Sequence, residues 1–153
     1  MALLSMFAKK PLLAEEDKSI IVDAIRSSEK KTSGEIRVYV ESHCKFVNSL
    51  DRAAEVFYLL QMDKTEFRNA VLVYVAIKDQ QLALFADEGI YKKTGAGYWN
   101  KAVAAMLQHF NKNNYGKGIA HVVVEIGDTL QSYFPYNSET DKNELPDDIV
   151  FGR

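Results

Sequence analysis

Four acidic residues that are far apart in the sequence hold positions from which they could act together: Glu35, Glu66, Asp87 and Glu88. Carboxylates brought into one place repel one another unless a cation lies among them, and Ca²⁺ and Mg²⁺ prefer oxygen ligands. The chemistry that these residues predict is the binding of a divalent cation. In the alternative interpretation, each acid forms an ordinary surface ion pair. The candidate partners are then Lys30, Lys31, Lys64, Arg68, Lys92 and Lys93.

Other reactive side chains give weaker patterns. Cys44 follows His43, but neighbouring residues of an extended segment point to opposite sides, so the pair does not predict an activated thiol. No two histidines have the spacing of zinc ligands. The Gly116-Lys117-Gly118 run lacks the full spacing of a phosphate-binding loop and the strand that precedes one. We therefore assign no catalytic residue and no organic-cofactor site.

The four acids flank three predicted strands. Residues 35–41 alternate apolar and polar side chains, residues 69–77 are almost continuously apolar, and residues 82–86 follow the polar turn Asp79-Gln80-Gln81. If the first two strands are parallel and the last two form a hairpin, one sheet edge collects the start of the first, the start of the second and the end of the third. Glu35, Glu66 and the Asp87–Glu88 pair stand at these three points.

Helical spacing of apolar residues fills most of the remaining chain. It predicts helices over residues 15–30 and 48–62, along the stripe from Trp99 to Phe110, and from Ile119 to Tyr133. The resulting order is α-β-α-β-β-α-α. We expect an α/β fold, a three-layer αβα sandwich with a mixed central sheet flanked by helices.

Length and charge restrict the class of protein. The 153 residues suit a single domain over 1–153, with an apolar N-terminal arm at 1–14 and an acidic C-terminal tail at 137–153. The net charge of -2 argues against a nucleic-acid partner. The single cysteine permits no internal disulfide, and no apolar run is long enough to span a bilayer. We expect a soluble cytoplasmic protein.

Several short motifs resemble the TPM-domain family, in particular its stand-alone bacterial branch. They are Ser33-Gly34-Glu35-Ile36-Arg37-Val38, Lys64 to Leu72, Asp87-Glu88-Gly89-Ile90, Tyr98-Trp99 and Asn143 to Ile149, so the resemblance runs from about Glu15 to the end. The resemblance implies an αβα sandwich with a divalent-metal site. Its candidate ligands here are Glu66, Asp87, Glu88 and Glu35, and we expect Ca²⁺ in preference to Mg²⁺.

Two functions remain open on these grounds. The first is a metal-responsive interaction or regulatory module, which binds a divalent cation and an unidentified protein partner. The second is a metal-assisted acid phosphatase acting on phosphomonoesters, in which Arg68 would hold phosphoryl oxygens. The sequence does not decide whether the protein is an enzyme.

Overall fold

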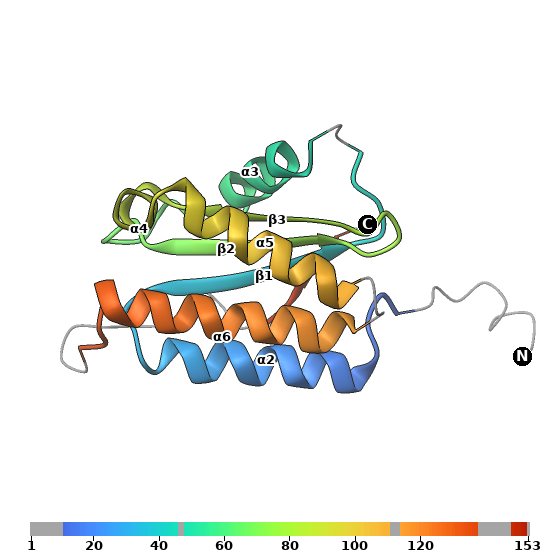
Figure 1. The fold of residues 1–153 in the computed structure, drawn as a ribbon, viewed down its shortest axis with the longest axis horizontal. Helices are drawn as coiled ribbons and strands as arrows, with labels where there is room; N and C mark the ends of the chain where they lie inside the picture. The colour runs from blue at the N-terminus through green and yellow to red at the C-terminus, as the bar shows by residue number, and fades with distance from the viewer. Residues whose placement is uncertain (1–10, 46–47, 111–113, 138–147, 153) are drawn as a thin grey trace, which may run out of the picture.

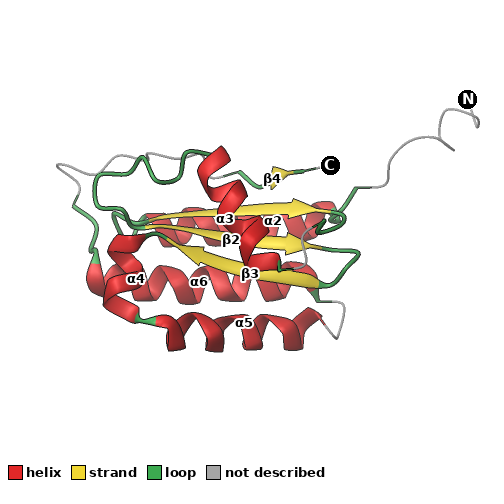
Figure 2. Cartoon of the chain, turned by 90° about the horizontal axis from the view of Figure 1, so that it is seen from above, coloured by secondary structure: helices red, strands yellow, loops and turns green. Residues whose placement is uncertain are grey.

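The computed structural model describes residues 11–45, 48–110, 114–137 and 148–152, and these build three layers (Figure 1). Helix α3 covers one face of a central sheet, and helices α2, α5 and α6 lie side by side across the other (Figure 2). The three-layer αβα sandwich and the mixed α/β class predicted from the sequence are confirmed.

The sheet has four strands in the order β3-β2-β1-β4. They are β1 (Glu35–Glu41), β2 (Ala70–Ala76), β3 (Gln81–Ala86) and β4 (Val150–Phe151). Strand β1 runs parallel to both β2 and β4, whereas β2 and β3 are antiparallel. Every residue of β2 is buried, which explains its nearly continuous apolar sequence.

The helices begin and end close to the positions that their sequences predict. This holds for α2 (Glu15–Glu29), α3 (Ser49–Leu59), α5 (Ala96–Phe110) and α6 (Tyr115–Tyr133), whereas α4 (Glu88–Thr94) had no predicted counterpart. Asn48 caps α3, because its side-chain oxygen accepts a hydrogen bond from the Leu50 amide at 2.8 Å.

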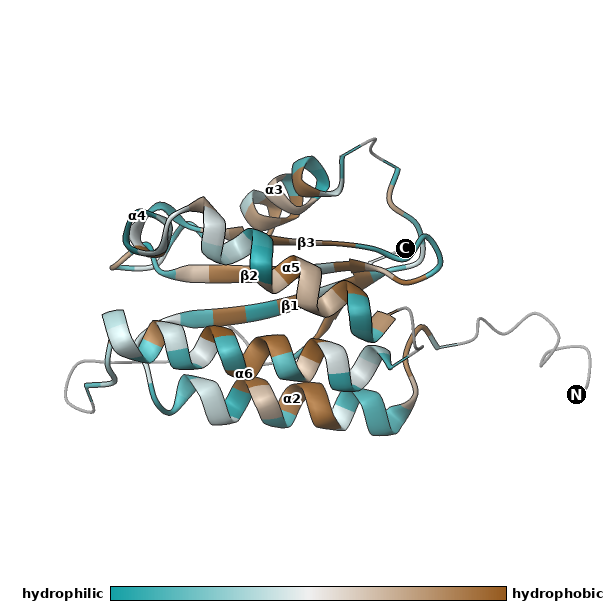
Figure 3. Cartoon of the chain, in the orientation of Figure 1, coloured by the Kyte–Doolittle hydropathy of each residue, from teal (hydrophilic) through white to brown (hydrophobic). Residues whose placement is uncertain are grey.

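Two apolar clusters occupy the spaces on either side of the sheet. The larger joins α2, α5 and α6 to one face through residues such as Ile36, Val73 and Ile126. The smaller joins α3 to the other face around Phe57, Leu72 and Tyr74. Figure 3 shows apolar residues recurring between polar ones along the helices, as expected of helices with one buried face. The alternation of β1 thus divides its side chains between two cores.

Two elements were not predicted from the sequence. Helix α4 follows β3 directly, and β4 pairs Val150 and Phe151 with β1, which anchors the C-terminal part of the chain as its apolar residues suggest. Most of the expected N-terminal arm and of the acidic tail lies outside the described residues. No helix in the described part of the chain combines the length and apolar character needed to cross a bilayer.

Candidate functional site

Strand register brings three of the predicted strand ends to one edge. Glu35, the first residue of β1, is aligned with Ala70, the first residue of β2. On the other side of Ala70, the Asp87 amide donates to the Ala70 carbonyl at 2.9 Å and continues the β2–β3 ladder. Glu35 and Asp87 therefore flank the same residue of the central strand, as the predicted topology requires.

Arg68 binds both acids that follow β3. Its Nε and Nη2 donate to the two Asp87 carboxylate oxygens at 2.6 and 2.8 Å, and its Nη1 lies 3.2 Å from Glu88 Oε1. Hydrogen bonding to Asp87 raises the pKa of the Arg68 guanidinium. The Asp87 side chain is almost fully buried, whereas 37% of the Arg68 side chain is exposed. The carboxylate is thus fixed, and its cationic partner reaches it from the solvent side.

Asp87 also begins helix α4. Its Oδ1 accepts a hydrogen bond from the Glu88 amide at 2.8 Å, which satisfies one of the free N–H groups of the first turn. A single carboxylate therefore ties the end of β3, the start of α4 and the loop that carries Arg68. A ligand that binds Asp87 would therefore affect all three of these segments.

The Arg68 loop lies directly against α4. The Gly89 amide donates to the Arg68 carbonyl at 2.8 Å, and a Cβ at position 89 would lie only 2.2 Å from the Phe67 carbonyl oxygen. Arg68 has a φ of 51°, in the left-handed region that non-glycine residues seldom adopt. Glycine at position 89 permits this close approach, and the loop backbone adopts a costly conformation to make it.

The other two predicted ligands are placed differently. Glu35 is buried with 2% of its surface exposed, and Glu66 is exposed in the turn before Arg68. No group of three or more metal-ligating side chains occurs in the described part of the chain. Among the four predicted acids, the structure brings Asp87 and Glu88 together on Arg68, one of the cationic partners that the sequence allows.

Two buried oxygens beside this loop lack a hydrogen-bond partner among the described residues: Thr65 Oγ1 and Asn69 Oδ1. Asn69 is fully buried and Thr65 is 6% exposed. Buried polar atoms normally find a partner, and oxygens of this kind suit a hard cation or a water molecule. Both oxygens belong to the loop that carries Arg68, the partner of Asp87.

A second polar cluster, at the other ends of β1 and β2, was not predicted. Glu41 is 2% exposed and accepts hydrogen bonds from Arg52 Nε and Nη2 at 2.9 and 3.0 Å, and from the Tyr74 hydroxyl. Burial alone would raise the pKa of Glu41, but the bonds from Arg52 and Tyr74 outweigh it and lower the pKa. The sequence signal was slight: Glu41 lies in phase with Tyr39 along β1.

The remaining reactive side chains mostly have structural roles. His43 Nδ1 lies 2.8 Å from Asp79 Oδ1, and the Cys44 amide donates to Asp79 Oδ2 at 2.7 Å. Asp79, in the turn between β2 and β3, thus holds the segment that follows β1. The hydrogen bond from His43 lowers the pKa of Asp79. The rings of His109 and His121 lie 5.7 Å apart, a proximity across α5 and α6 that sequence spacing does not reveal.

Comparisons with known proteins agree with this architecture. The family model of the TPM domain matches residues 7–129. The match begins before Glu15 and ends before the Asn143–Ile149 motif, so its limits differ from those of the resemblance in the sequence. A search of curated protein sequences finds no match.

Solved structures extend the comparison over almost the whole chain. The NMR structure of the BA42 protein from the psychrophilic bacterium Bizionia argentinensis is 36% identical, with a TM-score of 0.85, covering 95% of this chain and 99% of that one. N-terminal domains of a P. gingivalis protein and of the Corynebacterium glutamicum protein cg2496 share only the fold. The first is 15% identical, with a TM-score of 0.64 and coverage of 80% and 79%. The second is 12% identical, with a TM-score of 0.55 and coverage of 88% and 80%. From the family match and the BA42 similarity together, the chain belongs to the TPM-domain family.

Proposed function

We propose that this TPM domain binds a divalent cation at Asp87 and Glu88 and thereby acts as a metal-responsive regulatory module. The observation that carries the proposal is the buried Asp87 carboxylate, whose cationic partner is a partly exposed arginine from a neighbouring loop. A divalent cation and a guanidinium compete for the same two oxygens. Glu66 and Glu35 are the further acids that would contribute to the site.

The ligand chemistry favours Ca²⁺ over Mg²⁺. Ca²⁺ accepts six to eight oxygens in a flexible arrangement, whereas Mg²⁺ demands a near-ideal octahedron. The candidate oxygens belong to a strand end, a helix start and a loop, and Thr65 Oγ1 and Asn69 Oδ1 have no hydrogen-bond partner among the described residues. Such a mixed set supports the larger and more tolerant ion.

The regulatory step follows from the link between Asp87 and its loop. When the cation holds Asp87, Arg68 loses its bidentate partner and the loop of residues 65–69 loses its strongest contact with α4. The loop surface, including the exposed Phe67, would then differ between the metal-free and metal-bound forms. If a protein partner binds one of these two surfaces better than the other, its binding would depend on the metal concentration.

The phosphatase alternative is less well supported. Three nitrogens of Arg68 are engaged by Asp87 and Glu88, so the guanidinium that would hold a phosphoryl group is occupied. The proposal therefore assigns no catalytic role. Steady hydrolysis of an aryl phosphate that requires Ca²⁺ or Mg²⁺ and falls in Asp87→Asn would favour the enzyme instead.

Isothermal titration with Ca²⁺ and with Mg²⁺ tests the binding step. We expect Asp87→Asn to weaken Ca²⁺ binding at least tenfold, or about 1.4 kcal/mol, because it removes a ligand charge, while asparagine still caps α4. Arg68→Ala should strengthen binding, because it removes the competitor.

Asp128→Asn is the matched control. Asp128 is an exposed acid that lies 3.9 Å from Lys31 and is not one of the proposed ligands, so its substitution should leave Ca²⁺ binding unchanged. Backbone amide shifts on titration should concentrate in residues 65–69 and 87–90. If millimolar Ca²⁺ and Mg²⁺ produce neither heat nor shifts, the proposal is wrong.

A further inference from the structure

Strand β3 lies at one end of the sheet order, and no described strand pairs with its outer side. The Asp87–Ala70 hydrogen bond fixes the alternation of the antiparallel ladder, so the backbone groups of Phe85 and Ala83 point toward β2. Those of Leu82, Leu84 and Ala86 point away from the sheet. An unpaired edge of this kind is a template for another strand.

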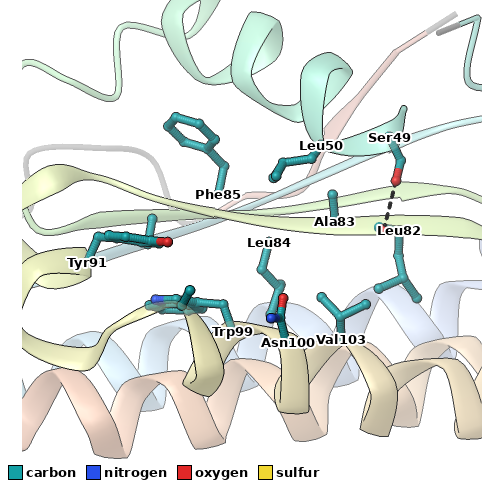
Figure 4. Close-up of a pocket in the computed structure, with 12 residues that line it drawn as sticks. Ser49, Leu50, Leu82, Ala83, Leu84, Phe85, Tyr91, Trp99, Asn100 and Val103 are labelled. Atoms are coloured by element: carbon teal, nitrogen blue, oxygen red, sulfur yellow. Dashed lines mark hydrogen bonds between the residues drawn. The ribbon is translucent and has the colours of Figure 1, made fainter. Parts of the chain in front are cut away.

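The edge lies in an apolar groove with a volume of about 360 Å³ (Figure 4). Leu50 of α3 forms one wall, and Trp99 and Val103 of α5 form the other, with β3 between them. Leu50 and Tyr91, at the rim, are 47% and 44% exposed. Water-exposed apolar walls beside unpaired backbone groups are the features of a surface that binds an extended peptide.

One outward carbonyl is already used. Ser49 Oγ donates to the Leu82 carbonyl at 3.1 Å, so pairing at that end of the strand is closed (Figure 4). The outward groups of Leu84 and Ala86 have no hydrogen bond in the described part of the chain. The available ladder is therefore short and centred on Leu84.

The two walls determine which occupant fits. Successive side chains of an added strand would face α3 and α5 alternately, so both sets must be apolar. A second β3 edge would bring its own α3 and α5 against these walls, which leaves room for one strand and not for another sheet. The groove thus selects a single extended segment that is mostly apolar.

The sequence before Pro11 contains a run that is apolar except for Ser5. Leu3, Leu4, Met6 and Phe7 form an apolar run that is followed by Lys9 and Lys10. Exposed Asp51 lies on α3 near the Ser49 end of the groove, and Lys92 and Lys93 lie on α4 near the other end. With the segment antiparallel to β3, charge complementarity would bring Lys9 and Lys10 near Asp51.

The same molecule cannot place the whole run in its own groove. Helices α2, α6 and α5 lie next to one another in that order (Figures 1 and 2), and packed helices are about 8–10 Å apart. Pro11 precedes α2, and the four residues from Pro11 back to Phe7 span at most about 14 Å, less than the two helix spacings to α5. From this we infer that residues 3–7 of one copy dock along β3 of a second copy, in a reciprocal dimer.

Light scattering of the full chain in EDTA, from micromolar to several hundred micromolar, tests the dimer. We expect the mass of two chains at high concentration. The arm variant Leu4→Asp/Phe7→Asp and the groove variants Ala86→Pro and Leu50→Asp should each weaken association at least tenfold. Proline at position 86 removes only an outward N–H, which an edge strand tolerates, and Leu50 is half exposed, so the fold persists in both.

Leu59→Asp is the matched control, because Leu59 is an exposed apolar residue of α3 that does not line the groove. It should dimerise like the natural chain. Mixing the arm variant with Ala86→Pro should restore association between the two, since one supplies an intact groove and the other an intact arm. A single-chain mass at every concentration, or a dimer that the arm variant leaves unchanged, would overturn the inference.

Discussion

At the residue scale, the buried Glu41 carboxylate shows how the sheet accommodates a charge. Arg52 supplies two hydrogen bonds and also lies over the Tyr39 ring, 5.8 Å from its centroid. The Tyr74 hydroxyl supplies another, and burial together with this bond raises the pKa of Tyr74. A buried carboxylate with three donors remains ionised, and its removal would leave the arginine without its main partner.

Glu41→Gln should lower the free energy of unfolding by about 2–3 kcal/mol at pH 7. The folded-state pKa of Glu41 lies below its ordinary value, so its contribution is complete above about pH 4.3 and is lost as the pH falls through the lowered pKa. The difference between the two proteins should therefore shrink below about pH 4. Urea unfolding from pH 7 to pH 3.5 measures it.

Glu55→Gln provides the comparison for this prediction. Glu55 also pairs with Arg52 but is 43% exposed, so its loss should cost less than about 1 kcal/mol. Its acid dependence should match that of the natural protein. A Glu41→Gln deficit that stays constant to pH 3.5 would contradict the assigned role of the carboxylate.

At this scale, sequence reasoning finds one of the two polar clusters and misses the other. The convergence of Asp87 and Glu88 with Arg68 is accessible, since the hairpin places β3's end beside β2's start and Arg68 is among the possible partners. The Glu41 cluster is not, because Arg52 comes from a helix whose rotation about its axis is set by packing. The exposed position of Glu66 depends on a loop with positive φ, which no periodicity encodes.

At the scale of elements, the contact between α4 and the Arg68 loop is unusually close. Gly89 lies at the second position of α4, where its missing side chain admits two backbone carbonyls. The helix has seven residues, and Asp87 is both its cap and the partner of Arg68. The loop and the helix therefore stabilise each other.

Gly89→Ala should destabilise the protein by about 1–3 kcal/mol, because the new methyl group would overlap the Phe67 and Arg68 carbonyls. Gly97→Ala in α5 is the control. Nothing lies within 4 Å of its added Cβ, and alanine favours a helix, so it should stabilise by up to about 1 kcal/mol. Urea unfolding of both variants checks the opposite signs; equal effects would contradict the close approach.

The longer elements were predictable, whereas the shorter ones were not. The bounds of β1 were predicted to the residue, because its alternation spans two cores. Helix α4 has too few turns to show a period, and the Asp87-Glu88-Gly89 run resembles a loop as much as a capped start. The two residues of β4 pair with a strand more than a hundred positions earlier, so only the apolar character of Val150 and Phe151 hinted at them.

At the scale of the whole molecule, the sheet is the shared wall of two cores. Strand β2 is central, paired on both sides and fully buried, whereas β4 contributes two residues at the margin. Opening either core therefore exposes the same strands. The placement of α3 on one face of the sheet is predictable from the sequence, because a parallel crossover such as β1-α3-β2 strongly favours one handedness.

Amide hydrogen exchange should reflect this architecture. We expect the slowest amides in β2 and in the β1 residues paired with it, near the free energy of global unfolding, because they exchange only when both cores open. The Gly152 amide, which donates to Val40 at the sheet margin, should exchange orders of magnitude faster. Comparable protection of the two regions would show that the margin is as stable as the centre.

The chain has a single tryptophan, and Trp99 forms a wall of the β3 groove while its Nε1 donates to Thr94 Oγ1 at 2.8 Å, at the end of α4. Its emission is therefore a built-in optical probe of two places at once. A segment seated beside the indole alters its polarity, and a shift of α4 alters its donor bond. Fluorescence quenching can thus follow ligation and self-association without an attached dye.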